Sequence, residues 1–168
     1  MEYLLLFIEF HIIKGKSILR TLFFCLGLGV FVYLFVDNEL YVNNVSFFNT
    51  TIIDILGILI GFTISAVAIF LSIDNSNINE AKNKKLNVKL YSKNISLYDS
   101  IFVGFFYIII IQGFLLIANF ICPLFVKETT VSGKILFSIN ISSLSYIILF
   151  MLKNVLEFYF ILTKKNIV

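Results

Sequence analysis

The chain is dominated by four apolar runs, each long enough to cross a bilayer as a helix. A bilayer core about 30 Å thick requires about 20 apolar residues in helical form. The runs cover residues 17–36, 52–73, 100–126 and 135–162. Because lipid offers the backbone no hydrogen-bond partner, each run has to form its backbone hydrogen bonds internally, and the runs lack the alternating polarity of a β-barrel. We therefore expect an all-α integral membrane protein with four transmembrane helices.

The composition supports a membrane protein and argues against a nucleic-acid-binding one. Hydrophobic residues make up 60% of the chain and charged residues 14%, against about 45–50% and about 25% in soluble domains. The net charge of +3 comes from lysines in short hydrophilic gaps, as is typical beside a membrane. Cys25 and Cys122 lie in apolar runs at different expected depths, so we interpret each as a small buried hydrophobe and expect no disulfide.

The distribution of lysine and arginine predicts the orientation of the chain. The segment before the first run and the gap between the second and third runs are basic, whereas the gap at 37–51 has no lysine or arginine. Cytoplasmic loops carry the excess of these residues. We therefore expect both termini and the 74–99 loop to face the cytoplasm.

The N-terminal segment 1–16 is apolar but too short to span. Glu2 and Glu9 are seven residues apart and share a helical face. Lys14, Gly15 and Lys16 then interrupt the apolar run. We interpret the segment as a helix lying in the cytoplasmic interface. The alternative is one long first helix that projects below the membrane, and the sequence leaves both open.

The 74–99 loop is the largest hydrophilic part of the chain. Leu86 and Leu90 predict a short amphipathic helix within it. The loop is either a solvated basic segment touching anionic lipid or a docking surface for a cytoplasmic protein partner. The candidate contact residues are its five lysines, Lys82, Lys84, Lys85, Lys89 and Lys93.

Small residues recur on one face of the second run. Gly57, Gly61, Ser65 and Ala68 follow one another at spacings of four, four and three residues. Helices in lipid associate through close backbone contact, which such a face permits. The partner is either the chain's own first or third helix or a second copy, which would make the protein a homo-oligomer.

Polar residues within the runs are candidates for a lining. Asp54 is expected to open the second helix near the outer surface, where it either favours the helix dipole or forms a carboxylate ring at a cation pore. The others are Gln112, Asn119, Asn140 and Ser143. These residues either bond between helices or line a narrow water path.

Four charged residues are expected at the inner boundary. They are Arg20, Asp99, Lys153 and Glu157. Charges at this depth can pair or extend to water. Lys153 and Glu157 are i, i+4 neighbours, and an Arg20–Asp99 contact is expected.

The sequence gives no sign of an enzyme. His11 has no companion ligands for a metal, and Gly27 and Gly29 lie within an apolar run rather than in a phosphate-binding loop. No nucleophile stands near a suitable base. We expect no catalytic residues, no metal and no cofactor.

The run "GILIGFTISAVAIFLS", followed by the Lys/Asn-rich loop and "LYDSIFVGFF", resembles small multi-pass membrane subunits of bacterial anti-phage defence operons. The resemblance implies an oligomer that senses attack or permeabilises the inner membrane when a cytoplasmic partner signals. The predicted function is an oligomeric, channel-like membrane effector. The alternative is a non-conducting anchor or sensor that recruits a partner through the 74–99 loop.

Overall fold

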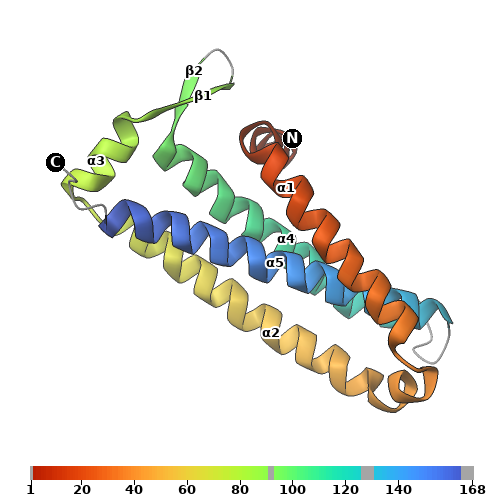
Figure 1. The fold of residues 1–168 in the computed structure, drawn as a ribbon. Coiled ribbons are helices and arrows are strands. Elements are labelled where there is room, and N and C mark those ends of the chain that lie inside the picture. The colour runs from red at the N-terminus through yellow and green to blue at the C-terminus, as the bar shows by residue number, and fades with distance from the viewer. Residues whose placement is uncertain (1, 91–92, 126–130, 164–168) are drawn as a thin grey trace.

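The computed structural model describes residues 2–90, 93–125 and 131–163 of the chain. Its elements are α1 (Glu2–Phe35), α2 (Asn38–Ser72), α3 (Ser76–Asn83), β1 (Lys85–Leu90), β2 (Lys93–Ser96), α4 (Leu97–Phe125) and α5 (Val131–Thr163). Four long helices form an elongated bundle, and α3 with the β-hairpin stands at one end of it (Figure 1). The expected all-α architecture is therefore present, with one small hairpin added.

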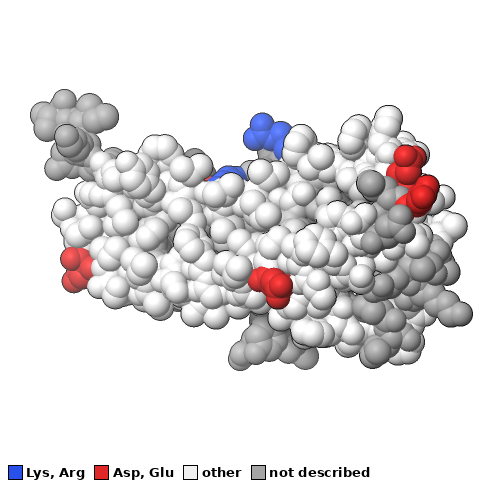
Figure 2. All heavy atoms as spheres, turned by 90° about the horizontal axis from the view of Figure 1, so that it is seen from below, with Lys and Arg blue, Asp and Glu red and all other residues white. Residues whose placement is uncertain are grey.

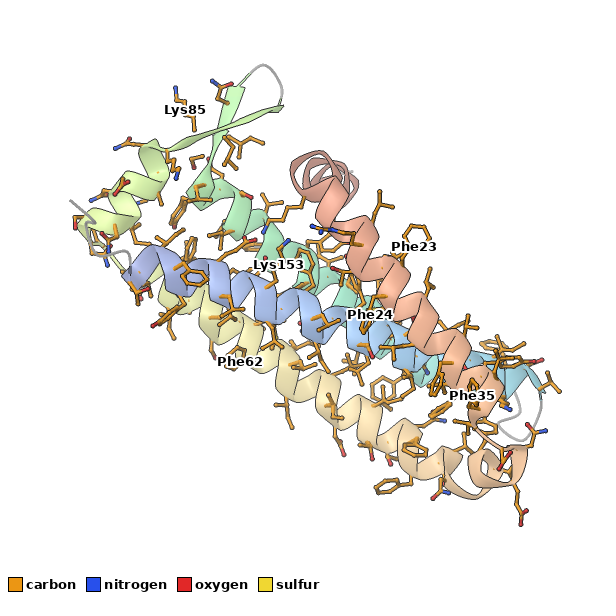
Figure 3. All side chains as sticks on the ribbon, viewed as in Figure 1. Phe23, Phe24, Phe35, Phe62, Lys85 and Lys153 are labelled. Carbon is orange, nitrogen blue, oxygen red and sulfur yellow. The ribbon has the colours of Figure 1, made fainter. Side chains whose placement is uncertain are left out.

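Four helices are long and apolar enough to cross a membrane. The candidate spans are Ile18–Phe35, Asn44–Ser72, Leu97–Cys122 and Val131–Thr163. Their outer surfaces carry large apolar side chains, such as Phe23 on α1 and Phe62 on α2 (Figure 3). On the face shown in Figure 2, charged side chains are few among the described residues. By length and composition the chain is a multi-pass membrane protein.

Helix α5 is the central element and packs against α1, α2 and α4. Lys14 on α1 meets Glu157 near the end of α5, whereas Asn38 at the start of α2 meets Lys134 near the start of α5. The beginning of α1 and the end of α5 therefore lie toward the same end of the bundle, beside α3 and the hairpin (Figure 1). The core of the bundle includes the fully buried side chains of Leu56, Phe105 and Phe150.

The second helix begins 14 residues earlier than predicted, at Asn38 rather than at residue 52. The polar residues of the expected 37–51 gap suggested a loop. However, Tyr41 and Val45, one turn apart, are buried against Phe137 of α5, and the Tyr41 and Phe137 ring centroids are 5.5 Å apart. This contact gives the segment an apolar helical face, and the helix continues without a break into the apolar run.

The first helix is continuous from Glu2 to Phe35, and Lys14, Gly15 and Lys16 do not interrupt it. Of the two predicted alternatives, the structure therefore has one long first helix. The first turns of α1 are seen nearly end-on in Figure 1, while the rest of the helix runs along the bundle. The helix axis therefore changes direction in its N-terminal part.

The short amphipathic helix predicted around Leu86 and Leu90 is wrong, because this segment is the first strand of an antiparallel hairpin. Apolar residues alternate with polar ones at Leu86, Val88 and Leu90, which is the period of a strand. The helix of this region lies earlier, at α3. The side chain of Asn75 caps it by accepting a hydrogen bond from the Ile78 amide at 2.8 Å.

Helices α4 and α5 approach closely at Gly104. A Cβ atom at this position would lie 2.8 Å from the Asn154 Oδ1 and 2.9 Å from the Asn154 Nδ2. Asn154 is fully buried and its Oδ1 accepts a hydrogen bond from Lys14, so its amide group cannot swing aside without losing that bond. Gly104 is therefore required for the contact between these helices.

We expect Gly104→Ala to lower the free energy of unfolding by about 1–3 kcal/mol, the usual cost of overpacking. The measurement is the thermal unfolding midpoint in detergent. Gly113→Ala on the same helix is the matched control, because a Cβ atom there meets nothing within 4 Å. Equal midpoints for the two variants would contradict the close approach.

Candidate functional site

The most unusual surface of the molecule is the outward face of α2. Ile52, Leu56 and Phe70 point into the bundle and are buried. On the opposite side of the helix the exposed positions carry a carboxylate and small side chains. They are Asp54, Gly57, Gly61, Ser65 and Ala68, which we call the α2 outer face. A helix that met only lipid would be expected to present large apolar side chains here.

Asp54 does not open the second helix as predicted, because α2 begins at Asn38 and Asp54 lies within it. The span Asn44–Ser72 places it about 15 Å from one end and about 27 Å from the other. The error follows from the early start of α2. Asp54 is exposed and forms no ion pair within the described part of the chain.

The two glycines of the α2 outer face have open space beside them in the described part of the chain. A Cβ atom at Gly57 or Gly61 would meet no atom within 4 Å. The Ser65 hydroxyl donates a hydrogen bond to the Gly61 carbonyl at 2.8 Å and is thus satisfied within the helix. Packing against the described parts of the chain's own first or third helix, one of the two predicted alternatives, is therefore not seen at Gly57 and Gly61.

Large side chains border this face on both sides. Ile58 and Phe62 lie along one edge, and Ile64 lies along the other. The exposed fraction of Ile58 is 72%, the highest among these three. The small residues therefore form the floor of a shallow groove along α2.

The other predicted lining residues lie apart from this groove, inside the bundle. The Gln112 Nε2 donates to the Thr63 hydroxyl at 3.3 Å, which joins α4 to α2. The Asn140 Nδ2 donates to the Asn119 Oδ1 at 2.8 Å, which joins α5 to α4. These residues form hydrogen bonds between helices inside the bundle. Asp54 is exposed on the outside of α2, so within one chain these residues and Asp54 do not line a common path.

Ser143 lies in a separate surface pocket between α1 and α5. The pocket has a volume of about 240 Å³ and also contains Gly29 and Ser142. The Ser142 hydroxyl donates to the Cys25 carbonyl at 2.7 Å and joins α5 to α1. Cys25 is buried and Cys122 is partly exposed, and both are free thiols.

The inner-boundary cluster differs from the predicted one in two members. Glu157 pairs with Lys153 at 3.9 Å, as their spacing predicts, but its shorter bond is with Lys14 at 2.6 Å. Arg20 is exposed, and the predicted contact between Arg20 and Asp99 is absent from the described ion pairs. Asp99 instead accepts hydrogen bonds from the amide and the hydroxyl of Ser96, where β2 joins α4.

Lys14 is a buried cation that fastens α1 to α5. Its side chain is only 8% exposed. The ammonium group donates to the Asn154 Oδ1 at 3.1 Å and lies 5.7 Å from the centroid of the Phe150 ring. Burial lowers the pKa of Lys14, and the carboxylate of Glu157 opposes this shift. The ion pair, the hydrogen bond and the ring together offset part of the cost of removing this charge from water.

Three lysines of the 74–99 segment, Lys82, Lys84 and Lys85, have described side chains, and all three are exposed. Lys82 lies over the Tyr98 ring, 5.2 Å from its centroid. Lys84 lines a pocket between α3, α4 and α5, and Lys85 is exposed beside it (Figure 3). The side chains of Lys89 and Lys93 lie outside the described residues.

Sequence reasoning missed the roles of Lys14 and Asn154. Lys14 was interpreted only as part of a basic flank, because the sequence does not reveal which helix α1 meets. Asn154 and Glu157 are three residues apart and share a face of α5. An amide and a carboxylate on one helical face, in a chain with a lysine beside its first apolar run, are the signal that could have indicated the contact with Lys14.

We expect the stability of the protein to rise with pH in a window that ends near the ordinary lysine pKa of about 10.4. Because the pKa of Lys14 is lowered in the folded state, the unfolded chain binds a proton in this window that the folded chain has lost. Lys14→Met should reduce the rise, measured as the unfolding midpoint in detergent from about pH 8 upward.

Lys153→Met is the control for this experiment. It makes the same change at the more exposed lysine beside Glu157, where 35% of the side chain is accessible. If wild type and Lys14→Met show the same pH dependence, burial does not affect the titration of Lys14.

The α2 outer face offers small side chains, on which another helix could pack, and a carboxylate within a candidate span. Within the described ranges, no group of three or more His, Cys, Asp or Glu side chains could hold a metal ion. Comparison of the chain with protein-family models, with curated proteins and with solved structures finds no match.

Proposed function

We propose that this chain is the subunit of a homo-oligomeric, channel-like membrane protein in which α2 faces the neighbouring copies and the central path. The observation that carries the proposal is the outward position of Asp54 among small residues, in the interior of a span. An ionisable side chain within a membrane span marks a functional site by default, because it is costly in hydrocarbon.

Self-association would relieve that cost. Copies packed through Gly57 and Gly61 could bring their backbones close together, since no side chain of the same subunit fills this groove. Asp54 would then leave the lipid for a polar contact or a water-filled path shared by the subunits. Such a ring of carboxylates attracts cations.

Exposed polar side chains lie on α2 on both sides of Asp54. Thr50 lies one turn before Asp54 and Ser65 lies three turns after it, and both are exposed. A face of hydroxyls, glycines and one carboxylate can line a narrow aqueous path. In this arrangement Gln112, Asn119 and Asn140 stabilise each subunit from within and do not line the path.

Orientation and location are part of the proposal. The basic N-terminal flank and the lysines between α2 and α4 favour placing both termini and the α3–hairpin segment in the cytoplasm. The bent first part of α1 favours an interfacial position for the first turns. The resemblance to defence-operon membrane subunits favours a bacterial inner membrane and a role in anti-phage defence.

A membrane anchor or sensor is the second candidate. The observation that favours it is the projection of α3 and the hairpin from one end of the bundle (Figure 1). The exposed Lys82, Lys84 and Lys85 give this projection a basic surface. A cytoplasmic protein with an acidic surface could bind there.

We expect Gly61→Leu to reduce self-association, because a leucine side chain would fill the floor of the α2 groove. The measurement is the protein mass in nanodiscs or detergent, by light scattering corrected for bound lipid or detergent. Gly27→Leu is the matched control, since Gly27 is exposed on α1 and a Cβ atom there meets nothing within 4 Å. An unchanged mass for Gly61→Leu would exclude this face as the seam.

We expect the wild-type protein to conduct potassium ions across liposome membranes and Asp54→Asn to reduce this flux several-fold. The substitution keeps the shape of the side chain and removes its charge. Glu39→Gln, at the exposed start of α2, is the control and should leave the flux unchanged. Absence of flux in the wild-type oligomer would reject the channel and favour the anchor.

A further inference from the structure

Two exposed charged side chains lie within the candidate spans, one on α1 and one on α2. Arg20 lies within the span Ile18–Phe35, and Asp54 lies within the span Asn44–Ser72. Within the described ranges, neither residue belongs to an ion pair. Charged side chains within spans are costly in hydrocarbon and pair with one another in most membrane proteins. Each of these two residues is therefore expected to have a partner outside its own chain.

The two side chains point away from the bundle on different sides. A helix turns by about 100° per residue, so a residue two positions after a buried one points away from the core. Arg20 comes two residues after the buried Ile18, and Asp54 comes two residues after the buried Ile52. Helices α1 and α2 lie on either side of α5 in Figure 1. The arginine and the aspartate therefore lie on opposite edges of one chain.

The two charges lie at a similar depth along the bundle. Ile18, beside the arginine, belongs to the buried cluster that contains Phe150 of α5. Leu56, beside the aspartate, belongs to the buried cluster that contains Ile147 of α5. Phe150 and Ile147 are less than one turn apart, so the two charges differ in depth by only about 5 Å. The long side chain of an arginine can extend over such an offset.

Charges of opposite sign at one depth, on opposite edges, are complementary between copies of the chain. Copies related by rotation about the membrane normal share the same depth, so residues at one level can meet. The α1 edge of one copy can then pack on the α2 edge of the next, in a head-to-tail contact that closes into a ring or continues as a row. A symmetric contact between two α2 helices would instead bring two carboxylates together, which is unfavourable.

We infer that Arg20 of one subunit pairs with Asp54 of the next, in a contact between the outer sides of α1 and α2. The inference rests on the self-association proposed above, and it names the surface that meets the α2 outer face. The aspartate thereby leaves the lipid for a polar contact. Gly57 and Gly61 follow it on the same face and leave room for the neighbouring α1.

The direction of the helices confines the contact to one part of α1. Neighbouring α1 and α2 run antiparallel, because α1 and α2 of one chain do. From Asp54, the two glycines of α2 therefore lie toward the beginning of the neighbouring α1. Gly27 lies in the other direction, about 10 Å beyond Arg20, and is outside the contact.

The test is an exchange of the two charges. The mass of the oligomer is measured over a dilution series in detergent, by light scattering corrected for bound detergent. Arg20→Asp and Asp54→Arg each place like charges against each other, so each should move dissociation to a protein concentration about 3- to 30-fold higher. A chain that carries both substitutions restores the pair with its signs reversed, and it should associate as the wild type does.

Neutral substitutions provide a second series that reverses no charge. Arg20→Gln and Asp54→Asn each leave one charge without its partner, whereas the two together leave none. The double variant should therefore associate more strongly than either single variant. Glu39→Lys and Lys85→Glu are the matched controls, because they reverse exposed charges outside the contact, and they should leave the mass unchanged.

The outcomes separate this pair from self-association itself. A wild-type oligomer that neither single reversal weakens, or that the double substitution fails to recover in both series, would overturn the pair and leave the homo-oligomer in place. Stronger association of Asp54→Asn than of the wild type would show that carboxylates face each other, and would also overturn it. A monomeric wild type would reject both the pair and the proposed oligomer.

Discussion

The cost of an unpartnered polar group in hydrocarbon governs the arrangement of this bundle. Inside the bundle, polar side chains meet partners on other helices: Gln112 meets Thr63, Asn140 meets Asn119, and Ser142 meets a backbone carbonyl of α1. Each of these bonds fixes which helix faces which, because generic apolar packing gives little directional preference in lipid. Asp54 stands outside this internal pairing, on the opposite side of α2.

The same constraint accounts for the surroundings of the buried Lys14, which lies near the end of α5. Lys14 is tolerated because a carboxylate, an amide oxygen and an aromatic ring surround its ammonium group. Gly104 permits the amide to occupy its position, and the contact thereby involves α1, α4 and α5 together. The chain thus holds Lys14 in a fixed internal contact and leaves Asp54 exposed on the outer face of α2.

Sequence reasoning could predict the number of spanning helices, because each depends on a long local run of apolar residues. It could not predict where α2 begins, since Tyr41 and Val45 become helical by packing on Phe137, which is distant in sequence. The hairpin was missed although Leu86 and Leu90 belong to an alternating pattern. The small residues of α2 were recognised from their spacing alone. The direction in which these residues face could not be predicted, because it depends on which face of α2 the other helices cover.

The lengths of the helices have a further consequence. Helices α2 and α5 contain 35 and 33 residues, which corresponds to about 50 Å each and exceeds a hydrocarbon core of about 30 Å. A helix with such an excess tilts, extends beyond the bilayer or thickens it locally. The position of Asp54 relative to the headgroups therefore depends on membrane thickness as well as on the protein. Lateral tension or a change in acyl-chain length would move this carboxylate along the polarity gradient of the bilayer, so the mechanical state of the membrane is coupled to the energy of a single side chain.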